Sequence, residues 1–79
     1  MEQKQKDNLE YFQNNLNTWL KDIKLKHKFV VICDKEVKGS FDSFEAGLEY
    51  ASSNFSPSEF IIQQVISSSE QINFIRFAV

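Results

Sequence analysis

Residues 28–44 read KFVVICDKEVKGSFDSF, and this stretch decides the fold. Lys28 to Cys33 is rich in β-branched and aromatic residues and shows no polar alternation. Such a run predicts a strand that is covered on both faces or lies at the centre of a sheet. Asp34-Lys35 then predicts a turn, which aspartate residues favour, into a more polar strand, Glu36 to Ser40. The stretch therefore predicts a hairpin whose second strand lies nearer the edge of the sheet.

Helical patterns flank this hairpin on both sides. Six apolar residues before it are spaced 3, 4, 3, 1 and 3, which predicts a helix over about residues 6–25; they are Leu9, Phe12, Leu16, Trp19, Leu20 and Ile23. Four lysines around the end of this helix suit the negative pole of its dipole: Lys21, Lys24, Lys26 and Lys28. After the hairpin, Asp42 and Glu45 predict a capping box that starts a helix over about 43–55, which Ser56-Pro57 ends.

Two further strands are expected after the second helix. Residues 59–66, EFIIQQVI, read as a third strand, and Ser67 to Glu70 as a polar turn. Residues 72–79, INFIRFAV, read as a fourth strand, with a short helix as the alternative because the apolar residues do not alternate cleanly. The predicted fold class is α+β in the order α-β-β-α-β-β. We expect one domain over residues 1–79, frayed over 1–5, with a mostly antiparallel four-stranded sheet and both helices on one of its faces.

Composition limits the classes of function. The formal net charge is −2, and neither half of the chain has the strong excess of one sign that marks nucleic-acid or membrane binders. No apolar run approaches the roughly 18–20 residues that span a bilayer, so no membrane association is expected. The single cysteine cannot staple the fold, which favours a reducing, cytoplasmic location.

A calcium site is the strongest local motif, and the sequence argues against it. Six residues fall at positions 1, 3, 5, 6, 9 and 12 of an EF-hand loop: Asp34, Glu36, Lys38, Gly39, Asp42 and Glu45. Position 5, however, is Lys38, which places an ammonium group where a ligand belongs, and the preceding segment has the composition of a strand. A hairpin turn followed by a helix cap explains the same residues.

Other catalytic and metal sites also lack the residues they need. Cys33 and His27 are the only residues of their kinds, and on one strand they would lie about 20 Å apart, too far for a nucleophile and its base. Structural zinc needs about four Cys or His ligands. The sequence therefore predicts no catalytic residues, no metal, no cofactor and no enzymatic activity.

The order of features resembles a class of small uncharacterised bacterial proteins of unknown function. The shared pattern is an N-terminal helix, aromatic–Val–Val–Ile, a hairpin, Gly–Ser–Phe–Asp, a helix and Phe–Ile–Ile–Gln–Gln, and it covers about residues 8–66. The residues that carry it are Phe29, Val30, Val31, Gly39, Phe41, Asp42, Ala46, Tyr50, Phe60, Ile61, Gln63 and Gln64. The resemblance implies a fold more than an activity. It also implies a retropepsin-like aspartic protease, encoded nearby, as a partner.

The expected function is protein interaction through a sheet edge or an aromatic patch, with a protein partner or a second copy in a homodimer. The motivation is the aromatic content, eight Phe, two Tyr and one Trp, which is heavy for one small core. The candidate partner-binding residues are Gln63, Gln64, Phe74 and Arg76. Binding of single-stranded nucleic acid by sheet aromatics beside the lysines is the alternative, which a pI near 5.3 disfavours.

Overall fold

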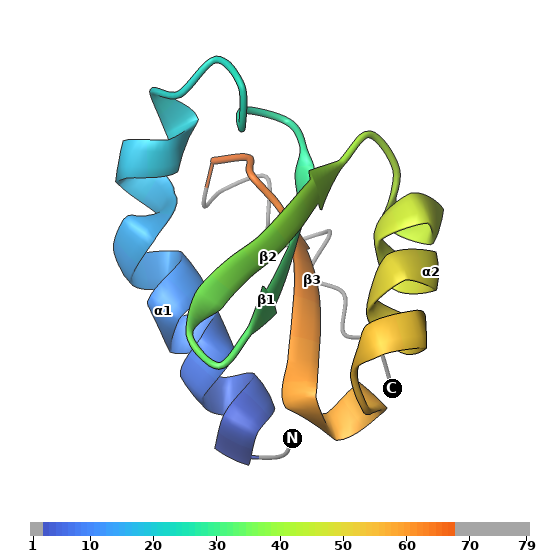
Figure 1. The fold of residues 1–79 in the computed structure, drawn as a ribbon. Helices are drawn as coiled ribbons and strands as arrows, with labels where there is room; N and C mark the ends of the chain where they lie inside the picture. Colours follow the sequence, from blue (N-terminus) through green and yellow to red (C-terminus); the bar gives the residue numbers. More distant parts are fainter. Residues whose placement is uncertain (1–2, 68–79) are drawn as a thin grey trace.

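The computed structural model describes residues 3–67 and shows an α+β fold (Figure 1). Its three strands form an antiparallel sheet in the order β2-β1-β3, so β1 is the central strand as its sequence predicts. The predicted fourth strand at 72–79 lies outside the described residues. The elements are α1 (Gln3–Leu20), β1 (Phe29–Cys33), β2 (Glu36–Phe41), α2 (Phe44–Asn54), the short 3-10 helix η1 (Pro57–Glu59) and β3 (Phe60–Gln64).

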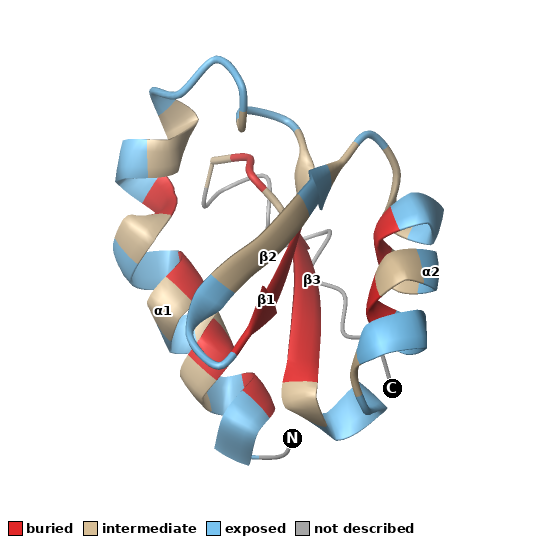
Figure 2. Ribbon diagram, viewed as in Figure 1, coloured by how far each residue is buried: buried red, intermediate tan, exposed pale blue. Residues whose placement is uncertain are grey.

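The two helices lie on opposite faces of the sheet, which corrects the predicted two-layer arrangement (Figure 1). Alternate residues of a strand point to opposite faces. Val30 and Ile32 of β1 pack in one apolar cluster with α1, whereas Val31 and Cys33 pack in a second cluster with α2. The uninterrupted apolar sequence of β1 thus follows from burial on both faces, with buried residues along its length (Figure 2).

The α1-side cluster is mainly aliphatic. Phe12 and Leu16 of α1 pack against Ile61 and Val65 as well as against β1. The Trp19 ring also packs against this cluster, and its centroid lies 5.8 Å from that of Tyr11 and 5.9 Å from that of Phe12. This face therefore holds the helix by a regular apolar stripe.

The α2-side cluster is built from rings around small helical residues. Its buried members are Val31, Cys33, Ala51, Phe60 and Ile62, and its partly buried members are Phe29, Phe41, Phe44, Leu48, Tyr50 and Phe55. Ring centroids follow one another at 5.4 to 6.4 Å along this face. The aromatic side chains of residues 3–67 all belong to one or the other of these two clusters.

The ends of α1 differ from those predicted. The helix begins at Gln3, and Gln5, expected in a frayed segment, is buried because its amide binds the main chain of Pro57. At the other end α1 stops at Leu20 and turns follow, so Ile23 is 90% exposed instead of lying on the apolar face of the helix.

The cap of α2 is one residue later than the sequence predicts. The Ser43 hydroxyl, not Asp42, accepts the Ala46 N–H at 3.1 Å. Asp42 instead pairs with the Lys28 ammonium across the sheet end. A hydroxyl and a carboxylate are both good caps, and the lysine draws the carboxylate away.

Candidate functional site

The outer edge of β2 is the surface of most interest. In the sheet order β2-β1-β3, no strand within residues 3–67 pairs with this edge. An edge strand directs alternate main-chain N–H and C=O groups away from the sheet, where a further strand can bind them. Figure 1 shows β2 running across the front of the fold between the two helices.

A β-bulge interrupts the edge at Lys38. Val31 pairs with Gly39 while Ile32 pairs with Val37, so Lys38 has no opposite residue on β1. The Lys38 ammonium lies 3.2 Å from the Glu36 carboxylate, and this hydrogen bond raises the pKa of Lys38. The Tyr50 hydroxyl donates to the Lys38 carbonyl at 3.5 Å. A bulge and a lysine are common protections of edge strands against indiscriminate pairing.

Beyond the bulge, residues 39–41 form a regular ladder with β1. Ser40 is exposed, while Gly39 and Phe41 face the α2 side and are half-buried. A Cβ on Gly39 would lie 3.0 Å from two ring atoms of Phe41, so glycine is what allows the Phe41 ring to cross this position. The edge open to pairing is therefore short and has a defined register.

The hairpin turn at the other end of β2 is held by a buried amide. Asp34 and Lys35 have φ values of 55° and 56°, the left-handed pair that a type I′ turn requires and that Asn-Gly satisfies with less strain. The Asn8 carboxamide is 1% exposed; its Oδ1 accepts the Lys35 N–H at 2.9 Å, and its Nδ2 donates to the Glu59 carbonyl at 2.9 Å. Asn8 thus ties α1 to the turn and to the start of β3.

Gln5, one helical turn before Asn8, makes a similar side-chain bond to the main chain of η1. Its Nε2 donates to the Pro57 carbonyl at 2.9 Å. At the surface nearby, the Lys4 ammonium lies 3.3 Å from the Glu59 carboxylate. The Ser56 N–H donates to the same carboxylate at 3.1 Å, and this bond, assisted by Lys4, lowers the pKa of Glu59.

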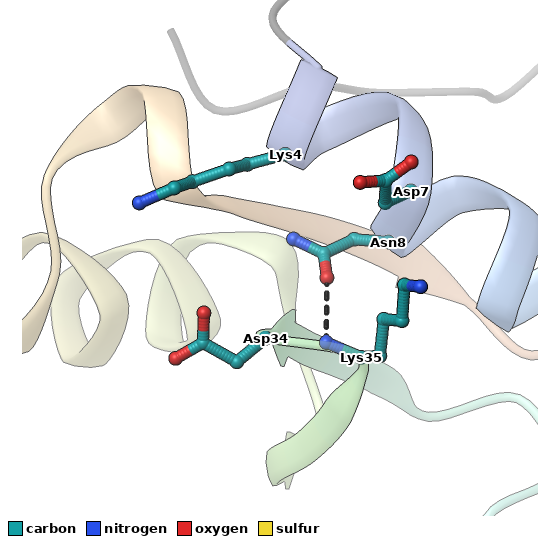
Figure 3. Close-up of a pocket in the computed structure, with 5 residues that line it drawn as sticks. All are labelled: Lys4, Asp7, Asn8, Asp34 and Lys35. Carbon is teal, nitrogen blue, oxygen red and sulfur yellow. Dashed lines mark hydrogen bonds between the residues drawn. The ribbon is translucent and has the colours of Figure 1, made fainter.

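An open pocket of about 250 Å³ lies between α1 and the hairpin turn (Figure 3). Two lysines, two aspartates and the Asn8 amide line it: Lys4, Asp7, Asn8, Asp34 and Lys35. In Figure 3 the Asn8 amide points to the turn and is occupied by it. The charged groups are of mixed sign, and the buried amide is already bonded to the turn.

Cys33 is the last residue of β1, whereas His27 lies two residues before the start of this strand. Cys33 is buried, and burial, followed by the charge of Asp34, raises the pKa of its thiol. A raised pKa keeps the thiol protonated, which disfavours nucleophilic reactivity. Within residues 3–67, no group of three or more His, Cys, Asp or Glu side chains is placed to hold a metal ion.

The predicted partner-binding residues are not brought together as one surface. The Gln63 side chain is 1% exposed and faces α1, which removes it from any surface that meets a partner. Gln64 is half-buried, and its Nε2 donates to the His27 carbonyl at 3.1 Å. Phe74 and Arg76 lie outside the described residues. Sequence reasoning missed Gln5 and Asn8, although they continue the helical stripe of Phe12 and Leu16.

Comparisons with known proteins give no relative: no family model, no curated protein and no solved structure matches the chain. Among the described residues, no helix has the length and apolar character needed to cross a bilayer.

Proposed function

We propose that this protein is a non-enzymatic interaction module that adds a strand of a partner protein to the β2 edge. The supporting observation is the position of β2 at the border of the sheet, with no strand of residues 3–67 beside it. Strand addition takes its affinity from main-chain hydrogen bonds and its specificity from alternate side chains.

The edge of β2 supports this function better than an aromatic patch does. Within residues 3–67, the rings that motivated a patch are distributed over two packed clusters. Gln63 and Gln64 on β3 are engaged within the chain, Gln63 by burial and Gln64 by the His27 carbonyl. Ser40 is the exposed side chain of the regular part of β2, so we expect it to contact the partner.

The bulge would make the interaction selective. With Lys38 out of register, a partner strand finds a regular ladder only along residues 39–41. A short ladder binds weakly unless the partner's side chains also fit. A retropepsin-like aspartic protease and a second copy of this chain are the two partners we propose to test first.

Site-specific photocrosslinking tests the surface. A benzoylphenylalanine at Ser40 should capture the partner in cells that express the protein, whereas the same group at Ser52, exposed on α2, should not. The captured protein, added to the isotopically labelled chain, should slow amide exchange in β2. Equal capture at both positions, or binding that leaves the exchange of β2 unchanged, contradicts the proposal.

Binding of single-stranded nucleic acid is the alternative function, and it has one supporting feature. Lys21, Lys24 and Lys26 are exposed. However, α1 and α2 cover the two faces of the sheet, so the open stacking platform used by single-strand binders is missing from the described residues. A titration of Trp19 fluorescence with an oligothymidylate at low and high salt tests it, because phosphate contacts make binding salt-sensitive.

A further inference from the structure

We infer that the loop over residues 21–27, here called the lysine loop, is a second docking element, which binds an acidic protein surface that surrounds an apolar pocket. Ile23 at its tip is 90% exposed and is the one large apolar residue exposed within residues 3–67. The loop has the sequence Lys-Asp-Ile-Lys-Leu-Lys-His, so lysines lie on both sides of Ile23 within three residues.

The exposure of Ile23 results from a hydrogen-bonded turn. The Asp22 carbonyl accepts the N–H groups of Leu25 at 3.0 Å and Lys26 at 2.9 Å, and its carboxylate accepts the Lys24 N–H at 2.9 Å. These bonds direct Leu25 into the α1-side cluster and leave Ile23 outside.

The C-terminal end of the lysine loop, at His27, is also held by hydrogen bonds. The His27 N–H donates to the Val65 carbonyl at 2.8 Å, and the His27 carbonyl accepts from Gln64 at 3.1 Å. His27 adopts φ 70°, a left-handed conformation that persists when the surroundings impose it. Because the loop is ordered before binding, little entropy is lost when a partner fixes it.

The charges around Ile23 indicate the kind of partner. Lys21, Lys24 and Lys26 are exposed, and within the described residues none of their ammonium groups forms an ion pair; Lys28, by contrast, pairs with Asp42. Three lysines and Asp22 leave the loop with a net charge of +2 on a chain whose net charge is −2. An apolar centre with a charged rim is the usual anatomy of a protein interface, and the rim selects a partner of opposite charge.

A protein partner fits these features better than a membrane or a nucleic acid. A bilayer would need more apolar surface than the single exposed side chain of Ile23 provides, because interfacial binding scales with the apolar area buried. The lysine loop also lacks an aromatic ring on which a base could stack. An isoleucine side chain, in contrast, is suited to a shallow apolar pocket in a protein.

Titration of the labelled full chain with designed peptides tests the inference. The probe peptide carries Asp and Glu on both sides of a Leu-Phe pair, and a control peptide has Ser-Ser in place of that pair. We expect the probe to shift the amide signals of residues 21–27 in a saturable, salt-sensitive manner. The control peptide cannot bury the Ile23 side chain, and it should bind about tenfold more weakly, since burying one aliphatic side chain corresponds to about that factor.

Two variants with a matched control complete the test. Ile23→Ser should weaken probe binding about tenfold. Lys24→Glu should weaken it, whereas Lys6→Glu, the same charge change at an exposed position on α1, should leave it unchanged. Equal effects of the two lysine variants, no effect of Ile23→Ser, or stronger binding to phosphatidylserine vesicles or oligothymidylate than to the probe would each overturn the inference. None of these outcomes depends on the β2 edge, so the two proposals fail separately.

Discussion

The two faces of the sheet are held to their helices in different ways. On the α1 side an apolar stripe is continued by the buried amides of Gln5 and Asn8, which bond to main-chain groups 27 to 52 residues away. On the α2 side, rings pack around Gly47 and Ala51. The α1 side therefore has buried amide bonds that hold the hairpin and η1, whereas the α2 side is mainly packed rings, with one long hydrogen bond from the Tyr50 hydroxyl to the Lys38 carbonyl. One of the α1-side bonds, from the Lys35 N–H to Asn8, holds the turn from which β2 starts.

The largest effects should come from removing one ring on each face. Phe12→Ala and Phe60→Ala empty positions that are 0% and 1% exposed, and each should cost about 3–5 kcal/mol. A domain of this size has only about 4–12 kcal/mol in total. Urea unfolding followed by Trp19 fluorescence and by circular dichroism should give coincident transitions. A difference above about 2 kcal/mol between the variants would show that one face dominates.

Removing the Asn8 amide tests the directional part of the comparison. Asn8→Ala leaves the Lys35 N–H and the Glu59 carbonyl without their partner, which should cost about 2–3 kcal/mol. The control is Asn15→Ala, whose amide bonds only to the Tyr11 carbonyl one turn earlier and should cost less than about 1 kcal/mol. Urea unfolding of both variants gives the comparison, and equal losses would contradict the role of Asn8 as a tie between elements.

Part of this architecture follows from the sequence. The uniform apolar run of β1 predicts its central, doubly covered position, and Asp34-Lys35 predicts the hairpin. The same run also implies helices on both faces, because a strand buried on two sides needs two covers; placing both helices on one face conflicts with it. The roles of Gln5 and Asn8 could be found only from their spacing with Phe12, since an amide on a helix is ordinarily solvated.

The β2 edge was predictable as an edge, but its details were not. The polar composition of residues 36–40 places that strand nearer solvent, as observed. The bulge at Lys38 depends on pairing with β1, which no local pattern specifies. The exposure of Ile23 could not be predicted, because its spacing continues the apolar stripe of α1. In the structure the hydrogen bonds of Asp22 form a turn, and the helix ends before it reaches Ile23.

The two glycines on the α2 side should respond to alanine with opposite signs. Gly47 lies within α2, and a Cβ there would meet Ile62 and Phe41 at an ordinary 3.5 Å; Gly47→Ala should therefore stabilise the protein by about 0.5–1 kcal/mol. Gly39→Ala places its Cβ 3.0 Å from the Phe41 ring and should cost about 1 kcal/mol. Thermal unfolding of both variants measures the difference. The same sign for both would show that the ring packing on this face is loose.

The smallest effect should be the pH dependence contributed by Glu59 at the polar end of the α1 side. Its folded-state pKa is lowered from 4.5, first by the Ser56 N–H and then by Lys4. A lowered pKa means that the folded state holds the carboxylate charged more strongly than the unfolded state does, so the contribution is present above about pH 4.5 and is lost as the pH falls through the folded pKa. Glu59→Gln should reduce the free energy of unfolding at neutral pH and approach the wild type in acid. Lys4→Met, which removes only the second cause, should have a smaller effect in the same direction. A gap between Glu59→Gln and wild type that stays constant from neutral to acid pH would contradict this role of the Glu59 charge and would show that Glu59 acts through packing.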